Sequence, residues 1–147
     1  MNIKEMEKLL HTEIPISRTM EVSVTELSST MLRLALPLKP NHNHKGTLFG
    51  GSSYAACALA CYGLFLSGLI ENGINTKNVV VGEGNIRYLE PIEKDCVVEA
   101  SWALADSQKE FFDNLARWKK SRTEMQAHIR VDGKLCAEFS AQFIAKT

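Results

Sequence analysis

A long apolar stretch without charge constrains the fold of this chain most strongly. Between Gly46 and Ile70 there is no Asp, Glu, Lys or Arg, and Ala, Cys and Leu occupy most positions after Tyr54. A helix that is apolar on nearly every side must be enclosed. The strongly apolar part, residues 54–70, is shorter than the roughly 20 residues of a membrane span and contains glycine and serine. We therefore predict a buried central helix over about residues 52–70 and no membrane association.

Alternating apolar and polar residues predict strands around this helix. The segments with this pattern are 18–30, 30–38, 79–89, 96–104, 123–131 and 134–145, and short helices are predicted at 3–11 and 107–118. Tight turns such as Asp132–Gly133 favour an antiparallel sheet. Gly82 and Gly84, predicted on one face, would allow close approach of the helix. We expect one α+β domain, residues 1–147, with a curved antiparallel sheet wrapped around one long central helix.

The overall composition excludes some functions. The formal net charge is +0, which argues against non-specific nucleic-acid binding and leaves no global field to steer an anionic ligand. Four scattered cysteines indicate free thiols in a reducing compartment. The N-terminal segment is charged and lacks the apolar centre of a signal peptide. These features predict a cytoplasmic protein.

The loop before the long helix resembles that of the hotdog-fold acyl-thioesterases. It contains Asn43, His44, Gly46, Thr47, Phe49, Gly51 and Ser52 at the family's spacing, and the segment "IRYLEPIEKDCVVEA" is similar to the strand that follows the helix. The nearest branch is the thioesterase-like domain found elsewhere behind a GNAT acetyltransferase domain. The resemblance covers nearly the whole chain. It implies the hotdog fold and a dimer or dimer of dimers with sites at the interface.

The same resemblance implies an acyl thioester of coenzyme A or of acyl carrier protein as substrate. Coenzyme A or phosphopantetheine then enters as part of the substrate, and no separate cofactor or metal is expected. The leading function is hydrolysis of this thioester. Decarboxylation of a malonyl thioester is the alternative, because it needs enolate stabilisation but no attacking water. A non-catalytic module that binds acyl thioesters is the third possibility.

The loop offers donors for the negative charge that develops on a thioester oxygen. Unpaired backbone N–H groups at a helix N-terminus carry partial positive charge, and glycines let a ligand approach them closely. Asn43 can add a side-chain N–H donor, or it can only close an Asx-turn. The glycines can equally serve loop geometry alone. Ser52 or Ser53 is predicted as an N-cap rather than a nucleophile.

Water activation is less well defined by the sequence. In the phenylacetate-type hotdog thioesterases a His and an Asp occupy the positions of Phe49 and Ala58, so that machinery has no counterpart here. His44 and Glu83 are the candidates, and His44 can also be an exposed side chain. Glu83 and Asn85 either act in the partner's site or face solvent. The predicted catalytic residues are Asn43, Gly51, His44 and Glu83, and the predicted substrate-binding residues are Gly46, Thr47, Phe49, Gly50, Ser52 and Asn85.

The basic run "RWKKSR", residues 117–122, has two interpretations. It is either a solvated surface or a landing patch for coenzyme A phosphates or an acidic carrier protein.

Overall fold

The computed structural model describes residues 1–104 and 106–147. Within them, the elements follow one another along the chain in the order α1 (Ile3–Glu13), α2 (Ile16–Thr19), β1 (Ser23–Leu27), β2 (Met31–Leu36), the 3-10 helix η1 (Lys39–Asn41), α3 (Gly50–Glu71), β3 (Val79–Tyr88), β4 (Cys96–Trp102), α4 (Ser107–Trp118), β5 (Lys120–Val131) and β6 (Lys134–Lys146).

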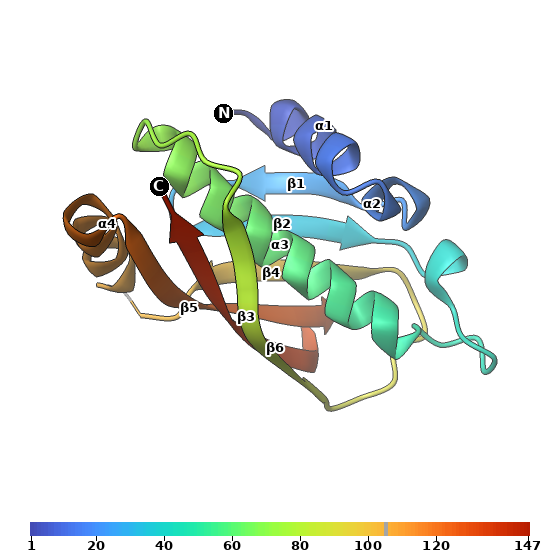
Figure 1. Cartoon of the computed structure of the whole chain (residues 1–147). Helices are drawn as coiled ribbons and strands as arrows, with labels where there is room; N and C mark the ends of the chain where they lie inside the picture. Colours follow the sequence, from blue (N-terminus) through green and yellow to red (C-terminus); the bar gives the residue numbers. More distant parts are fainter. Residues whose placement is uncertain (105) are drawn as a thin grey trace.

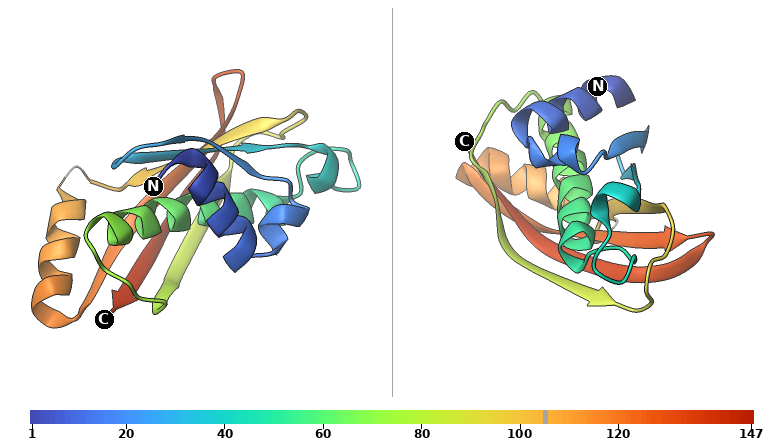
Figure 2. Two further views of the ribbon diagram at one scale, coloured as in Figure 1. Left: turned by 90° about the horizontal axis from the view of Figure 1, so that it is seen from above. Right: turned by 90° about the vertical axis from the view of Figure 1, so that its right-hand side faces the viewer.

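A six-stranded antiparallel sheet curves around helix α3 (Figure 1). The strand order is β1-β2-β4-β5-β6-β3. The two further views show α1 and α2 beside α3 over the β1 end, and α4 at the C-terminal end of α3 (Figure 2). This arrangement confirms the predicted α+β hotdog architecture, including the sheet that wraps a single long central helix.

Helix α3 is enclosed because its side chains fill the concave side of the sheet. Its buried residues include Leu64, Phe65 and Leu69, and Phe65 contacts the rings of Trp102 and Phe143. By length and composition α3 could cross a membrane, but two thirds of its apolar window is buried inside the domain. The helix therefore has the burial of a core helix in a soluble domain.

Three element boundaries differ from the predictions. Helix α3 begins at Gly50, two residues earlier than expected, and its N-cap is Phe49, which has no side-chain hydroxyl or carboxyl; the predicted serine N-cap is therefore wrong. Strand β1 begins only at Ser23, because Met20 closes the short helix α2 after Pro15. Strand β5 begins at Lys120, so half of the basic run belongs to the sheet.

Two β-bulges reverse the side-chain direction that strict alternation predicts. In β3 the register shifts between Val81 and Glu83, so Gly82 lies against Ile144 on the outer face rather than toward the helix. In β6 Arg130 pairs with Leu135 although Ile129 pairs with Ala137, so Leu135 leaves the face shared by Ala137 and Phe143. A bulge inserts one unpaired residue, which simple period-2 counting does not detect.

Gly84 confirms the predicted close approach of helix and sheet. A Cβ at this position would lie 2.1 Å from the hydroxyl of Tyr54 on α3. The ring of Tyr54 also meets Phe139 of β6 edge to face, with centroids 5.1 Å apart. The glycine thus provides the space in which the aromatic side chain of α3 reaches the sheet.

The two edges of the sheet are protected differently. On β1 the backbone N–H of Val24 donates to the Glu7 carboxylate of α1 at 2.8 Å, and α1 packs beside this strand. On β3 the exposed apolar side chains Val80 and Val81, 53% and 45% accessible, lie along an edge that no described element covers. An uncovered apolar edge strand is a site for pairing with another chain.

All four cysteines are free and buried. Cys57 and Cys61 lie on α3, and burial raises the pKa of both thiols far above the ordinary value. Burial also raises the pKa of Cys96, on β4, to about 12. The thiols of Cys57, Cys61 and Cys96 are therefore neutral core side chains at physiological pH, with their reactive thiolate form strongly disfavoured.

Candidate functional site at the start of helix α3

A short closed loop leads into α3. Its base is a β-bridge between His42 and Leu48. The buried side chain of Asn41 donates to the carbonyls of Met20, at 2.9 Å, and Pro37, at 2.8 Å. The backbone carbonyl of Asn41 accepts the backbone N–H of Phe49 at 2.8 Å. Asn41, which the sequence analysis did not single out, therefore fixes the residue at which α3 begins.

Asn43 organises the loop from inside. Its Oδ1 accepts the backbone N–H groups of Lys45 and Thr47, at 2.9 and 3.1 Å, which forms an Asx-type turn. Its Nδ2 donates to the Thr47 hydroxyl at 2.9 Å, so one N–H of the amide has no acceptor among the described residues. Gly46 has φ +77°, a left-handed conformation that glycine adopts without strain. Asn43 thus closes a turn in the structure, which is one of the two roles that the sequence left open.

The first turn of α3 presents unpaired backbone donors. Ser53 N–H bonds to the Phe49 carbonyl at 3.1 Å, whereas Gly50, Gly51 and Ser52 donate to no acceptor within the described residues. The Ser53 hydroxyl turns back to the Phe49 carbonyl at 3.4 Å and caps no N–H group. These free N–H groups carry the positive end of the helix dipole and favour negative charge. The geometry therefore suits the oxyanion-binding role predicted for Gly51.

Two aromatic rings rest on this turn because it contains glycine. A Cβ on Gly51 would lie 2.4 Å from the Phe49 ring, and a Cβ on Gly50 would lie 3.2 Å from the Tyr88 hydroxyl. The Tyr88 hydroxyl donates to the Gly50 carbonyl at 2.8 Å. Desolvation raises the pKa of Tyr88 above its ordinary value, so its hydroxyl stays a neutral donor.

A hollow of about 480 Å³ opens at this turn. Its lining residues come from the loop, α3 and the segment after β3: Leu48, Gly50, Gly51, Ser53, Tyr88, Leu89, Glu90, Pro91 and Ile92. The segment after β3 is held in place because the Cys136 carbonyl, at the β6 bulge, accepts the N–H groups of Leu89 and Glu90. The hollow thus combines helix-terminal donors with one carboxylate.

Sequence reasoning missed Tyr88 and Glu90 as site residues. Glu90 lies 3.5 Å from the ammonium group of Lys134, which orients its carboxylate in the wall of the hollow. The available signal was the pair Glu90–Pro91, a carboxylate beside a proline just after the end of the predicted strand. The sequence alone does not show that Glu90 reaches the start of α3. The structure places it there, because the Cys136 carbonyl at the β6 bulge accepts the Leu89 and Glu90 N–H groups.

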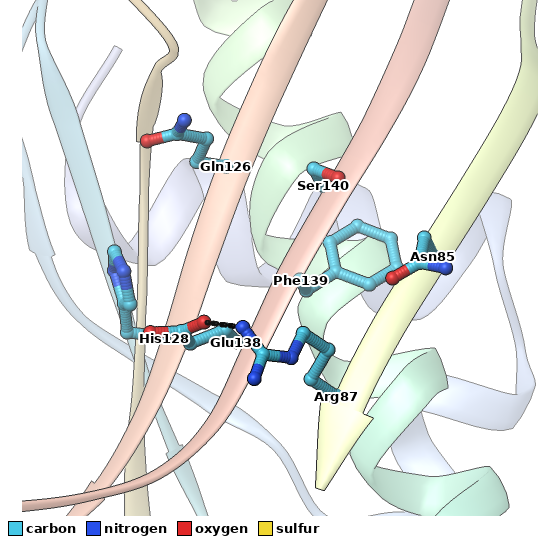
Figure 3. Close-up of a pocket in the computed structure, with 7 residues that line it drawn as sticks. All are labelled: Asn85, Arg87, Gln126, His128, Glu138, Phe139 and Ser140. Carbon is cyan, nitrogen blue, oxygen red and sulfur yellow. Dashed lines mark ion pairs between the residues drawn. The ribbon is translucent and has the colours of Figure 1, made fainter.

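The other predicted site residues are spread over the molecule. His44 and Gly46 are exposed at the loop tip, and His44 makes no hydrogen bond within the described residues. Glu83 and Asn85 lie on the outer face of β3. Figure 3 shows Asn85 in a separate outer hollow with Arg87 and Glu138, whose charged groups are 3.5 Å apart. A single chain does not bring Glu83 or Asn85 to the hollow at α3, and their action in a partner's site stays a prediction.

No group of three or more metal-ligating side chains gathers within residues 1–104 and 106–147. His42 and His44 are exposed in the loop, whereas Cys57 and Cys61 are enclosed in the core.

Comparison with known proteins identifies the family. A family model described as "Putative thioesterase (yiiD_Cterm)" matches residues 3–147. The chain belongs to this thioesterase family. Among solved structures, it is similar to a protein of unknown function from Chlorobaculum tepidum, at 30% identity and a TM-score of 0.88, covering 98% of this chain and 94% of that one.

Two further solved structures are similar to this chain. The Shewanella oneidensis protein described as a "putative thioesterase" is 25% identical, with a TM-score of 0.87 and coverage of 99% and 97% of the two chains. A "Probable Thioesterase" from Pseudomonas aeruginosa, at 19% identity, shares the fold with a TM-score of 0.82 over 99% and 96%. The yiiD_Cterm family thus supports thioester hydrolysis as the general reaction class.

Proposed function

We propose that this protein hydrolyses acyl thioesters of coenzyme A or acyl carrier protein at the N-terminus of α3, in the cytoplasm. The observation that carries the proposal is the unpaired N–H groups of Gly50, Gly51 and Ser52 in a hollow that also contains Glu90. A thioester oxygen directed at these groups gains stabilisation as it becomes negative, and the fixed donors need no reorganisation. Gly51 is the proposed central donor, because it lies in the middle of the free turn.

Glu90 is the proposed general base for the attacking water. It is a carboxylate in the wall of the same hollow, and Lys134 holds it. A base must lie within hydrogen-bond reach of the water it activates, directly or through one further water. His44 and Glu83, the candidates from sequence, do not line this hollow. The presence of a carboxylate beside the donors favours hydrolysis over decarboxylation.

The Glu90→Gln variant is expected to lose thioester hydrolysis by at least about 10²-fold, because the amide cannot accept the proton of the attacking water. The assay follows release of free thiol from straight-chain acyl thioesters. Malonyl thioester is offered in parallel, with acetyl thioester and carbon dioxide as the products sought. Decarboxylation that persists in Glu90→Gln would replace hydrolysis as the function. Tight binding without any product would indicate the non-catalytic module.

Asn43 is proposed to act as a positioning residue that shapes the loop before α3. Asn43→Ala is expected to lower turnover about 10- to 100-fold, because the loop before α3 loses the hydrogen bonds that close its turn. Asn43→Asp keeps the oxygen that accepts the Lys45 and Thr47 N–H groups, and should restore turnover to within about threefold of wild type. Equal losses in both variants would instead show that the free N–H of Asn43 donates to the substrate.

We further propose that the functional unit is a dimer paired through β3. The β1 edge is already closed by Glu7, whereas the β3 edge is uncovered and apolar. An incompletely buried stripe on α3, formed by Ala55, Ala58, Tyr62, Leu66 and Ile70, accompanies this edge. An uncharged helix face and an open edge strand are both typical of surfaces that another chain covers. Assembly of two such dimers remains part of the same proposal.

A further inference from the structure

Two side chains of opposite charge lie along the outer face of the open strand β3. Glu83 pairs with Gln142 of β6, and Arg87 pairs with Glu138. Both are exposed, and Figure 3 shows Arg87 beside Asn85 on the outer side of the strand. Glu83 forms no ion pair within the described part of the chain, and the guanidinium of Arg87, 71% accessible, lies 3.5 Å from Glu138. The strand therefore presents one negative and one positive group near its uncovered edge.

The direction of the backbone groups limits the ways in which a second strand can pair with β3. The Leu89 N–H donates to the Cys136 carbonyl, so Leu89 directs its backbone groups toward β6. Successive residues of an antiparallel strand direct these groups to opposite sides. Gly84, Ile86 and Tyr88 therefore direct theirs to the open edge. A copy of β3 must face these residues with the same set, so the allowed registers differ by steps of two residues.

The same alternation separates the two faces of the strand. Gly84 faces helix α3, because a Cβ there would meet the Tyr54 hydroxyl, and Ile86 packs against the core. Asn85 and Arg87 line the hollow on the outer face. In every allowed register, outer side chains of one chain therefore lie opposite outer side chains of the other, and helix-side residues lie opposite helix-side residues.

One of the allowed registers pairs both charges. When the two-fold axis passes beside Asn85, each Glu83 lies opposite Arg87 of the second chain, and the symmetry forms this pair twice. On the helix side, Gly84 of each chain then lies opposite Ile86 of the other. The branched side chain thus faces a residue that has none, which leaves room for it between the strands.

The neighbouring registers lose this complementarity. An axis beside Gly84 places Glu83 opposite Asn85, and an axis beside Ile86 places Arg87 opposite Asn85. The next register on either side places Glu83 opposite Glu83 or Arg87 opposite Arg87, and like charges directly opposite are destabilising. Backbone hydrogen bonds form in all of these registers, so the side chains distinguish them.

We propose that Glu83 and Arg87 select the register of the dimer by forming two interchain ion pairs, one on each side of Asn85. This inference rests on the proposed dimer paired through β3, and it names the contacts that the pairing uses. It assigns Glu83, a catalytic candidate from the sequence, to recognition of the second chain. The partner is a further copy of the same chain, because the order of negative, neutral and positive side chains complements its own reverse.

The register also determines which part of the second chain lies beside the proposed thioester site. Tyr88, whose hydroxyl donates to the Gly50 carbonyl, lies opposite the bulge that contains Gly82 of the second chain. Val81 of the second chain, 45% exposed in the single chain, comes next along that strand. The first half of each β3 therefore borders the hollow of the other chain.

Reversal of either charge tests the inference. Glu83→Arg places arginine opposite arginine at both interchain pairs, and Arg87→Glu places glutamate opposite glutamate. The dissociation constant of each variant dimer, measured by sedimentation over a concentration series, should rise about 10- to 100-fold. The rise should be smaller in about 1 M salt, which screens exposed charges. Wild-type dissociation constants in both variants would overturn the proposal.

A double variant separates the interface from local effects within the strand. Arg87→Glu also loses the ion pair with Glu138, so its weaker association alone does not identify the interface. Glu83→Arg/Arg87→Glu keeps this loss but restores both interchain pairs with reversed polarity. It should dimerise within about threefold of wild type. A double variant that associates as weakly as the single variants would overturn the proposal.

The matched control reverses a charge in the same row of the sheet but away from the edge. Glu124 is exposed on β5, opposite Gln142, and forms no ion pair within the described residues. Glu124→Arg should therefore keep the wild-type dissociation constant. An equal loss of association in Glu124→Arg and Glu83→Arg would show a general effect of charge on the sheet, and would overturn the assignment to the edge.

Mixing the two single variants tests the pairing directly. Glu83→Arg chains carry arginine at both positions and Arg87→Glu chains carry glutamate at both, so every interchain pair in their heterodimer joins opposite charges. Chains with different tags, co-expressed, should form heterodimers in clear excess over random pairing. Random pairing would overturn the register. A wild-type chain that stays monomeric throughout would refute the proposed dimer and the register with it. Because mass is measured, failure of the proposed hydrolysis would leave these results unchanged.

Discussion

Above about pH 9 the free energy of unfolding is expected to fall steeply, by up to about 4 kcal/mol per pH unit. Cys57, Cys61 and Cys96 cause the effect, because burial raises the pKa of each thiol in the folded protein. Below pH 9 the thiols are protonated in both states and have no influence. Above it, the unfolded chain releases protons that the folded chain retains, so unfolding becomes more favourable as the pH rises.

Denaturant unfolding under reducing conditions between pH 7 and about 10.5 measures this slope. Cys57→Ala should reduce the slope by about one third, or roughly 1.4 kcal/mol per pH unit, whatever its effect on stability at pH 7. Lysine ionisation contributes equally to both slopes, so the difference between the slopes of wild type and Cys57→Ala reports the thiol alone. A free energy of unfolding that stays level through pH 10 would contradict the buried, neutral state of the thiols.

Val81→Lys is expected to separate the dimer into monomers and to reduce thioester turnover at least about 10²-fold. Val81 is 45% exposed on β3, the uncovered edge of the sheet. A lysine on an edge strand opposes pairing, because its charge would be buried against the other chain. Turnover falls because Tyr88 and the segment that follows it line the proposed site and lie at the end of the paired strand, so they lose support when the dimer separates.

Sedimentation velocity measures the mass of the variant, and circular dichroism verifies that it is folded. Val97→Lys is the matched control, because Val97 is similarly exposed, at 41%, but lies on the central strand β4. The control should keep the wild-type mass and turnover. A fully active Val81→Lys monomer would refute the proposal that two chains are needed, and a variant that remains dimeric would place the interface on another surface.

The fold could be predicted from sequence to a large extent because two strong periodic patterns dominate the chain. The uncharged run that became α3 and the alternation in β2, β4 and β6 each correspond to one element. Errors arose where a local feature interrupts the period. The bulges at Gly82 and before Ala137 reverse the side-chain direction, and the short helix α2 that follows Pro15 extends into the start of the predicted first strand.

The candidate site could be predicted only in part. The loop and the glycines at the start of α3 are contiguous in sequence, so their chemistry could be inferred directly. Tyr88 and Glu90 join them through hydrogen bonds to residues 38 and 46 positions away, Gly50 and Cys136. Such long-range juxtapositions depend on strand register, which a single sequence does not define.

The Glu7 carboxylate that accepts the Val24 N–H has a consequence for how the chain associates. A sheet with two open sides could extend indefinitely by successive addition of subunits, and would give filaments. In the proposed dimer only the β3 side accepts a neighbour, so growth through the sheet is expected to end after a single addition and to give two-fold symmetry. If the proposed pairing holds, one acidic side chain on the first helix thus favours a closed pair over a filament.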